Sequence, residues 1–395
     1  MGTVRLRAGH VQPVWAGHPW VFAQGIEEVQ GAPGAGDVVT VVDAKGKFLG
    51  KGYWSPKSAI PVRILSRDPD STLDGRELGE RIEAAAGWRK SLWHLPGDDD
   101  SGYRLVHAEG DRLAGLIVDV YDKVAAVQLL TIGMKRREDE IFAHIARVTG
   151  VSTIVEVSSP RQQTLEGFEV ETRIVRGPDV EALRFRERRF EFEIPLSVAQ
   201  KTGYYFDQRD NRARIEQLAK GKRVLDAFCY VGSFSFAAAR GGATEIIAMD
   251  KSAGAIAGGA RMAEKHGYSR TISFQVTDIK KALPQLHSQG DRFDMVIIDP
   301  PKLAPTARHL EAAKRAYRTL NGNAIRLVKP GGVLVSCSCS AAMSPAALTR
   351  IIGMAATDAK RDVTLLAMGE QAPDHPNPAS FPEGRYLKCA ILQVR

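Results

Sequence analysis

The C-terminal half of the chain alternates short apolar runs with longer amphipathic segments. The apolar runs predict strands at 223–228, 245–249, 271–276, 293–298 and 332–336, and the amphipathic segments predict helices near 233–240, 253–267, 279–287, 306–328 and 345–359. Regular alternation of this kind is typical of an α/β fold with a parallel, doubly wound, Rossmann-like sheet. Two further runs, at about 363–368 and 386–393, predict an antiparallel edge.

The N-terminal half has a different pattern. Residues 1–72 contain short apolar runs punctuated by glycine and proline, which predicts a small β-rich domain. Residues 73–178 mix predicted strands with helices and show no catalytic constellation. Residues 179–395 form the predicted C-terminal domain, and clean alternation around a charged turn predicts that a β-hairpin at 183–194 opens it.

Acidic residues close the predicted strands of the C-terminal sheet. The first turn, Asp226–Ser233, holds one glycine, so it lacks the pyrophosphate cradle of dinucleotide enzymes, and a cofactor without phosphates fits better. Asp250 is placed to accept ribose hydroxyls, and Asp278 to accept an adenine amino group. Each acid could instead cap a helix. Several carboxylates in a row are hard to explain as core residues, because burying a carboxylate without a partner costs free energy. With Asp299 included, the set predicts S-adenosylmethionine.

Two neighbouring strands carry the candidate chemistry. The strand 296–298 ends at Asp299-Pro300-Pro301-Lys302, and the strand 332–336 continues into Cys337-Ser338-Cys339-Ser340. Because the carboxyl ends of parallel strands form ligand crevices, we expect Asp299 and Cys339 to face one another. Cys337 would share a strand face with Cys339 and is not excluded as the reactive thiol.

Composition indicates a globular protein with a basic net charge. The chain has 395 residues, 44% of them hydrophobic and 25% charged, and a net charge of +8, which favours a polyanionic partner. Four cysteines are too few and too oddly spaced for a disulfide framework, and no metal site is expected. The sequence shows no long apolar run and no secretory leader, so we expect a cytoplasmic protein that does not cross a membrane.

Basic residues gather in two places. Between residues 302 and 329 there are seven lysines and arginines and a single acid; Arg308, Arg315 and Arg318 recur at near-helical spacing opposite apolar positions. In the N-terminal domain Lys51 lies near Trp54, a mixture of charge and aromatic surface that suits RNA. We expect these five residues to contact RNA, although a merely solvated surface would look similar.

Several motifs together resemble one known family. They are Lys201–Arg212 (KTGYYFDQRDNR), Asp226–Gly232 (DAFCYVG), Asp299–Lys302 (DPPK), Ser338–Ser340 (SCS) and Tyr386–Lys388 (YLK). Over its whole length the chain resembles the RlmI-type bacterial 23S ribosomal RNA cytosine-C5 methyltransferases. The resemblance implies an N-terminal PUA domain, a central α/β domain, a class I methyltransferase domain, 23S ribosomal RNA as partner and a homodimer.

The resemblance also assigns roles to residues. It implies that Cys339 is the nucleophile, and we expect Asp299 and Lys302 to assist it. S-adenosylmethionine is expected to contact a set drawn from the polar loop and the strand ends: Asp207, Arg209, Asn211, Asp226, Phe228, Tyr230, Gly232, Asp250, Lys251, Asp278 and Asp299.

The expected reaction begins with addition of the Cys339 thiolate to C6 of cytosine, which makes C5 nucleophilic. Lys302 and the basic helix after it could favour the thiolate, and Asp299 would hydrogen-bond the ring. The base that removes the C5 proton is not identified. One rival is a methyltransferase acting on an exocyclic purine amine, which needs no cysteine. Another is an RNA-binding module with a decayed methyltransferase fold, against which the intact acids argue.

Overall fold

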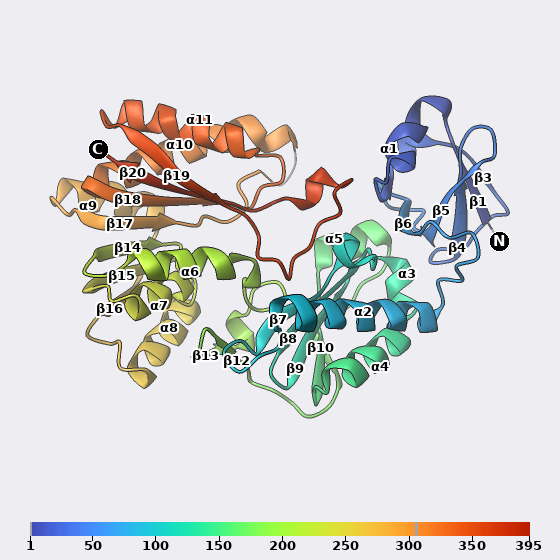
Figure 1. The fold of residues 1–395 in the computed structure, drawn as a ribbon, viewed down its shortest axis with the longest axis horizontal. Helices are drawn as coiled ribbons and strands as arrows, with labels where there is room; N and C mark the ends of the chain where they lie inside the picture. The colour runs from blue at the N-terminus through green and yellow to red at the C-terminus, as the bar shows by residue number, and fades with distance from the viewer. Residues whose placement is uncertain (1, 305–306) are drawn as a thin grey trace. The chain divides into compact units, whose positions relative to one another are not determined.

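The computed structural model describes residues 2–304 and 307–395. By its contacts the chain forms two compact units. The first contains the residues up to Phe192 together with Ala199–Phe206 and Pro373–Gly384, and the second contains Glu193–Val198, Asp207–Ala372 and Arg385–Arg395 (Figure 1). The chain therefore passes between the units several times.

The first unit begins with a six-stranded sheet of order β2-β6-β5-β4-β1-β3. Its strands are β1 (Gly2–Leu6), β2 (Trp20–Val21), β3 (Ile26–Gln30), β4 (Val38–Val42), β5 (Phe48–Trp54) and β6 (Val62–Ser66), with one short helix, α1 (Val11–Trp15). The strands are antiparallel neighbours except β1 and β4, which are parallel. The predicted β-rich N-terminal region is confirmed.

A second sheet of order β11-β10-β9-β8-β7 follows in the same unit. Its elements are α2 (Gly75–Trp93), β7 (Gly102–His107), β8 (Leu116–Tyr121), β9 (Val124–Leu129), α3 (Ile132–Lys135), α4 (Glu138–Thr149), β10 (Thr153–Glu156), α5 (Pro160–Glu166) and β11 (Arg173–Arg176). Helix α2 buries Leu78 and Ile82 against this sheet, as its apolar spacing predicts. The edge strand β11 and helix α5 were not predicted.

The predicted hairpin is present as β12 (Ala182–Glu187) and β13 (Phe190–Pro195). Its two-residue turn has φ of +50° at Arg188 and +67° at Arg189, the pattern of a tight hairpin turn. The sequence grouped this hairpin with the C-terminal domain, whereas the structure packs most of it in the first unit. Aromatic contacts hold the hairpin there. The centroid of the Phe185 ring lies 5.2 Å from that of Phe192 in the hairpin and 5.3 Å from that of Tyr121 in β8.

A buried ionic network joins distant parts of the first unit. Arg89 of α2 donates to both carboxylate oxygens of Asp111 at 2.5 and 2.8 Å, and to the carbonyl of Asp374 at 2.8 Å. Arg104 of β7 pairs with Asp119 of β8 in the same two-pronged way, and its backbone N–H donates to the Asp374 carboxylate. The segment Pro373–Gly384 is thereby fixed to the middle of the first unit, although it lies near the end of the chain.

The second unit is built on a seven-stranded sheet of order β16-β15-β14-β17-β18-β20-β19. The strands are β14 (Arg223–Ala227), β15 (Glu245–Asp250), β16 (Ile272–Val276), β17 (Phe293–Ile298), β18 (Val328–Ser338), β19 (Val363–Gly369) and β20 (Lys388–Val394). The pairs among β14 to β18 are parallel, and β20 runs antiparallel between β18 and β19. The doubly wound sheet and its antiparallel edge are confirmed.

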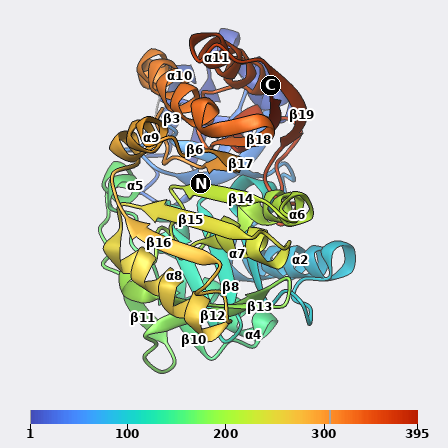
Figure 2. The ribbon, with the colours of Figure 1, turned by 90° about the vertical axis from the view of Figure 1, so that its left-hand side faces the viewer.

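Helices cover both faces of this sheet (Figures 1 and 2). They are α6 (Arg209–Leu218), α7 (Ser233–Arg240), α8 (Ala253–Lys265), α9 (Ile279–Ser288), α10 (Leu310–Leu327) and α11 (Pro345–Asp358). Short 3-10 turns lie at Ala8–His10, Ala23–Gly25, Ala108–Asp111, Leu196–Val198, Phe206–Gln208, Ala307–His309 and Pro382–Gly384. No helix in the described parts of the chain is long and apolar enough to cross a membrane.

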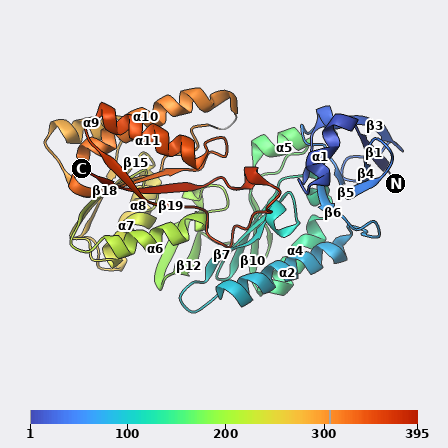
Figure 3. The ribbon, with the colours of Figure 1, turned by 45° about the horizontal axis from the view of Figure 1, so that its top comes forward.

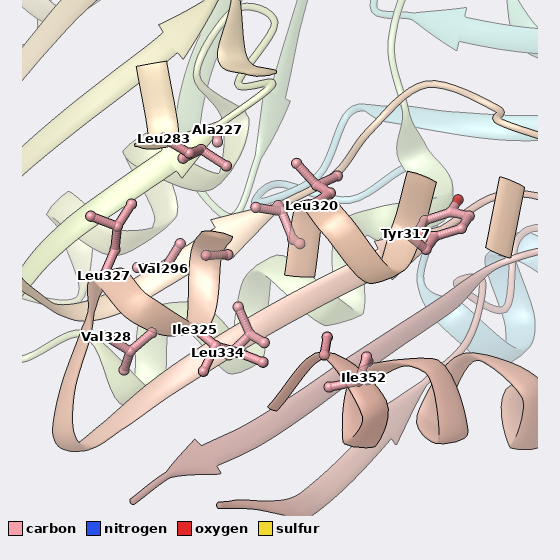
Figure 4. Close-up of a cluster of buried hydrophobic side chains, with 14 of the residues drawn as sticks. Ala227, Leu283, Val296, Tyr317, Leu320, Ile325, Leu327, Val328, Leu334 and Ile352 are labelled. Carbon is pink, nitrogen blue, oxygen red and sulfur yellow. The ribbon is translucent and has the colours of Figure 1, made fainter. Parts of the chain in front are cut away.

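A hydrophobic cluster of the second unit lies between the sheet and helices α9, α10 and α11. Figure 4 shows Leu320 and Ile325 of α10 together with Val296 of β17 and Leu334 of β18, and α10 and α11 are also adjacent in Figure 3. Because α10 buries this face, its basic residues are left on the opposite one. The cluster thus fixes the strands whose ends carry the candidate chemistry.

Candidate functional site

The candidate site is the edge of the second unit's sheet at which its parallel strands end. The strand register aligns the carboxyl ends of β14, β17 and β18. Ala227 of β14 lies opposite Ile298 of β17, and Ile298 lies opposite Ser336 of β18. Asp299 directly follows β17, and Cys339 directly follows β18. The structure therefore brings the two predicted catalytic residues to neighbouring positions on one edge, as parallel strands require.

The turn after β14 has an unusual backbone. Phe228, Tyr230 and Gly232 have φ of +66°, +54° and +85°, a region that residues with side chains seldom adopt. The Tyr230 N–H donates to the Asp250 carboxylate at 3.0 Å, which holds the turn against β15. A Cβ on Gly232 would come within 2.7 Å of the Phe274 ring, so this position requires glycine.

Asp226 is a buried carboxylate with an incomplete set of partners. Ser235 of α7 donates to its Oδ2 at 2.6 Å, while Oδ1 has no donor among the residues that the structure describes. Burial raises the pKa of Asp226 to about 7, and the charge of Asp250 acts in the same direction while the hydrogen bonds from Ser235 oppose it. A bound group that donates a hydrogen bond or carries positive charge would satisfy this oxygen.

The pKa of Asp226 makes stability depend on pH. A carboxyl whose pKa rises from 3.8 to about 7 on folding stabilises the fold at low pH, and this contribution is lost as the pH rises from about 4 to about 7. Without cofactor we expect Asp226→Asn to remove roughly 2–3 kcal/mol of the stability difference between pH 5 and pH 8. Urea unfolding at both pH values measures this.

The matched control for this experiment is Asp278→Asn, since Asp278 is exposed and caps α9 by accepting from the Lys280 N–H at 3.0 Å. This control is expected to keep the wild-type pH dependence. A wild-type pH dependence in the Asp226→Asn protein would contradict the assignment.

Asp250 and Asp278 lie at the ends of β15 and β16, where they were expected. Asp250 is partly buried and accepts from Ser252 and Tyr230 backbone N–H groups, one on each oxygen. Each of its oxygens retains capacity to accept a further bond. Asp278 serves as the helix cap that sequence reasoning had weighed as its alternative, and Lys251 is exposed beside Asp250.

The polar stretch at the start of α6 lies beside Asp299. Gln208 donates from Nε2 to Asp299 Oδ2 at 3.1 Å, and its Oε1 accepts from Asn211 at 2.7 Å. Asp207 accepts from the Tyr386 hydroxyl at 2.7 Å through Oδ2, whereas its buried Oδ1 has no donor in the described chain. Gln208 was not among the predicted site residues, although it lies within the motif 201–212.

Two of the residues predicted to contact the cofactor, Asn211 and Arg209, are buried. Asn211 donates to the carbonyl of Glu370, and its Oδ1 lies against Gly369, where a Cβ would be only 1.9 Å away. Arg209 is also largely buried, at the first position of α6. Asn211 thus joins α6 to the end of β19, and a contact of Asn211 or Arg209 with the cofactor stays a prediction.

The two cysteines at the end of β18 differ in accessibility. Cys339 is partly exposed, whereas Cys337 is fully buried and lies opposite Cys389 of β20. Its hydrogen bond with Cys389 and its burial hold the pKa of Cys337 well above the usual range of a thiol. Cys337 therefore stays protonated, which favours Cys339 as the reactive thiol. Lys302 is exposed in the loop after Asp299.

The residues expected to contact RNA fall into two groups. Arg308 and Arg315 are exposed. Arg318, however, forms a two-pronged ion pair with Asp358 of α11 at 2.6 and 2.7 Å, which neutralises its charge. The spacing of residues within α10 could not predict this ion pair, because the partner lies forty positions away in α11.

The N-terminal prediction needs a larger correction. Lys51 is buried in β5 and donates to the Ser71 carbonyl at 2.7 Å, so its ammonium is not available to a phosphate. Trp54 is half-buried and packs against the core of the first sheet. Neither residue forms the exposed pair that the sequence suggested.

The donor and acceptor balance fits the predicted cofactor. S-adenosylmethionine offers an ammonium group, ribose hydroxyls and an adenine amino group, and the edge offers the unpartnered oxygens of Asp226 and Asp207 together with Asp250. Within the described residues, no group of three His, Cys, Asp or Glu side chains could hold a metal ion.

Comparisons with known proteins agree with this geometry. A PUA-like domain family matches residues 4–67, and the family of S-adenosylmethionine-dependent methyltransferases matches residues 104–382. A relative from Shewanella denitrificans is 36% identical over 99% of both chains, and one from Pseudoalteromonas translucida is 35% identical over 99% of both. Both relatives are named ribosomal RNA large subunit methyltransferase I.

Solved structures show the same fold along the whole chain. A Streptococcus mutans protein described as an S-adenosylmethionine-dependent methyltransferase superposes with a TM-score of 0.85 at 20% identity, covering 100% of both chains. A structure described as a methyltransferase in complex with SAH gives the same TM-score and coverage at 19% identity. The chain belongs to the S-adenosylmethionine-dependent methyltransferases, within the family of the ribosomal RNA large subunit methyltransferases I.

Proposed function

We propose that this chain methylates C5 of a cytosine in 23S ribosomal RNA through a covalent bond between Cys339 and C6. The observation that carries the proposal is the difference between the two cysteines at the end of β18. Cys339 is partly exposed at the edge where Asp299 lies, while Cys337 is buried opposite Cys389 of the neighbouring strand β20. A methyltransferase acting on an exocyclic amine has no need of an accessible thiol there.

Cytosine C5 is a weak nucleophile, and a covalent step overcomes this. The Cys339 thiolate adds to C6, and the C5–C6 π electrons become available at C5 as an enamine. S-adenosylmethionine supplies the methyl group as an electrophilic sulfonium methyl. Loss of the C5 proton to a base then expels the Cys339 thiolate and restores the C5–C6 double bond, so the free enzyme is regenerated.

Asp299 is the group placed to recognise the ring. Gln208 donates to its Oδ2, which orients the carboxylate from the start of α6. An ionised Asp299 accepts from the exocyclic amine of cytosine and so orients the ring, whereas a protonated Asp299 donates to N3 and stabilises the negative charge that develops there during the addition. Gln208 thus acts on the base through Asp299.

The RNA would approach along α10. Arg315 of α10 and Arg308 of the turn just before it are exposed, which suits phosphate contacts. A cytosine within a duplex hides C5 and C6 in the stack, so the substrate base must lie in a loop or be flipped out.

The test is the identity of the product. Unmodified 23S ribosomal RNA is incubated with the protein and S-adenosylmethionine, digested to nucleosides and analysed by mass spectrometry against synthetic standards. We expect 5-methylcytosine above the level of a reaction without protein. An N-methylated purine in its place would assign the chain to amine methylation. RNA binding with no methylated nucleoside would indicate a binding module.

A further inference from the structure

Lys388 is a buried cation beside the candidate nucleophile. It opens β20, lies opposite Ser338 of β18, and is 1% exposed. Its Nζ donates to the carbonyl of Ser340 at 2.6 Å and to the carbonyl of Tyr386 at 2.8 Å. The residue immediately after Cys339 is therefore bound by a charged side chain that comes from a neighbouring strand.

The whole Ser338–Ser340 segment is held by side-chain hydrogen bonds. Tyr317 of α10 donates to the Ser338 hydroxyl at 2.9 Å, and the Ser340 hydroxyl accepts from the Ala304 N–H at 3.2 Å. These bonds are between neutral groups, so they orient the segment without adding charge. Lys388 both orients the segment and brings a positive charge to it.

The charges around this segment are of both signs. Lys302, Glu370 and the Cys339 side chain lie near enough to Lys388 to influence it electrostatically, and Cys339 and Asp299 influence Tyr317 in the same way. Cys337 and Cys389 lie opposite one another on the adjoining strands β18 and β20, and burial together with the hydrogen bond from Cys389 raises the pKa of the Cys337 thiol. Burial lowers the pKa of Lys388 to about 8, against the attraction of Cys339, so the amine is protonated at neutral pH.

We propose that Lys388 is a positioning residue that fixes the Ser340 carbonyl and stabilises the thiolate of Cys339 with its buried ammonium group. The proposal rests on the function proposed above, since the thiolate is the nucleophile of that reaction. It transfers to Lys388 the role that the sequence suggested for Lys302. Lys302 is exposed, and an exposed charge is screened by water and salt, whereas a buried one acts at close to full strength. The proton of the thiol passes to solvent, and Lys388 keeps its own.

The test measures the ionisation of Cys339 without RNA or cofactor. The rate of alkylation by iodoacetamide is followed against pH, and fragmentation of the labelled peptide separates Cys339 from Cys337. We expect Lys388→Met to move the midpoint of this curve up by about one pH unit or more, and Lys388→Arg to stay close to wild type because it keeps the charge. Lys302→Met is expected to leave the midpoint in place.

A second measurement needs no variant and covers the case in which Lys388→Met does not fold. The wild-type midpoint is compared at 50 mM and 1 M potassium chloride; a buried source of charge predicts little change, and an exposed source predicts a rise. An unmoved midpoint in folded Lys388→Met, or a rise with salt in the wild type, would overturn the proposal. If the midpoint moves in Lys388→Met but the wild type makes no 5-methylcytosine, the proposed function is wrong and the stabilisation of the Cys339 thiolate by Lys388 still holds.

Discussion

Replacing Cys339 with alanine is expected to reduce formation of 5-methylcytosine by at least about a thousandfold, because the alanine side chain cannot form the bond to C6 that activates C5. Cofactor affinity should change little, since Cys339 is not among the acceptors that suit S-adenosylmethionine. Nucleoside mass spectrometry measures the first quantity, and calorimetry measures the second. Retention of more than about a tenth of wild-type activity would rule out Cys339 as the nucleophile.

Cys337→Ala is the matched control, since it removes a thiol two residues away that is fully buried. We expect it to retain activity within a few-fold of wild type. RNA that contains 5-fluorocytosine offers an independent readout, because fluorine cannot leave as the C5 proton does and the adduct therefore accumulates. Wild type and Cys337→Ala should form a denaturation-resistant complex with this RNA, and Cys339→Ala should form none.

Replacing Arg89 with methionine is expected to lower the free energy of unfolding of the first unit by about 3–5 kcal/mol. The substitution leaves Asp111 as an unpaired buried carboxylate and removes the donors to the carbonyls of Asp374 and Arg104. Urea unfolding followed by circular dichroism measures the change. The double variant Arg89→Met with Asp111→Asn should recover part of the loss, because the unpaired charge is then gone.

Arg76→Met is the control on the same helix. Its side chain is 79% exposed and its ion pair with Glu80 spans 3.9 Å, so the expected loss is below about 1 kcal/mol. Equal losses in the Arg76 and Arg89 variants would show that the buried network contributes no more than a surface pair.

The order of elements and the acids at strand ends could be predicted because both depend on local pattern. A parallel sheet places the carboxyl ends of its strands on one edge, so Asp299 and Cys339 could be expected on that edge, and the pairing of β17 with β18 makes them neighbours. Contacts between distant residues could not be predicted in this way. The burial of Lys51 depends on a carbonyl twenty positions away, and the pairing of Arg318 depends on Asp358.

The roles of Lys388 and Cys337 were hidden for a related reason. Both depend on β20 lying between β18 and β19, and a strand's neighbours cannot be deduced from its own apolar pattern. The motif Tyr386–Lys388 was a usable signal, since a lysine that opens an apolar strand is unusual. Its role became clear only when the opposing residue, Ser338, was identified.

The contacts of Asp374 also constrain how the chain matures during its synthesis. Arg89 and Arg104 precede Asp374 by 285 and 270 positions. At about 5–20 residues per second, a ribosome needs roughly 15–60 s to add the missing partner after Arg89 has been made. Throughout that interval the Arg89 guanidinium and the Arg104 backbone N–H each lack a native acceptor. The unit that is translated first therefore receives its last segment only after all strands of the second unit's sheet except β20 have been translated.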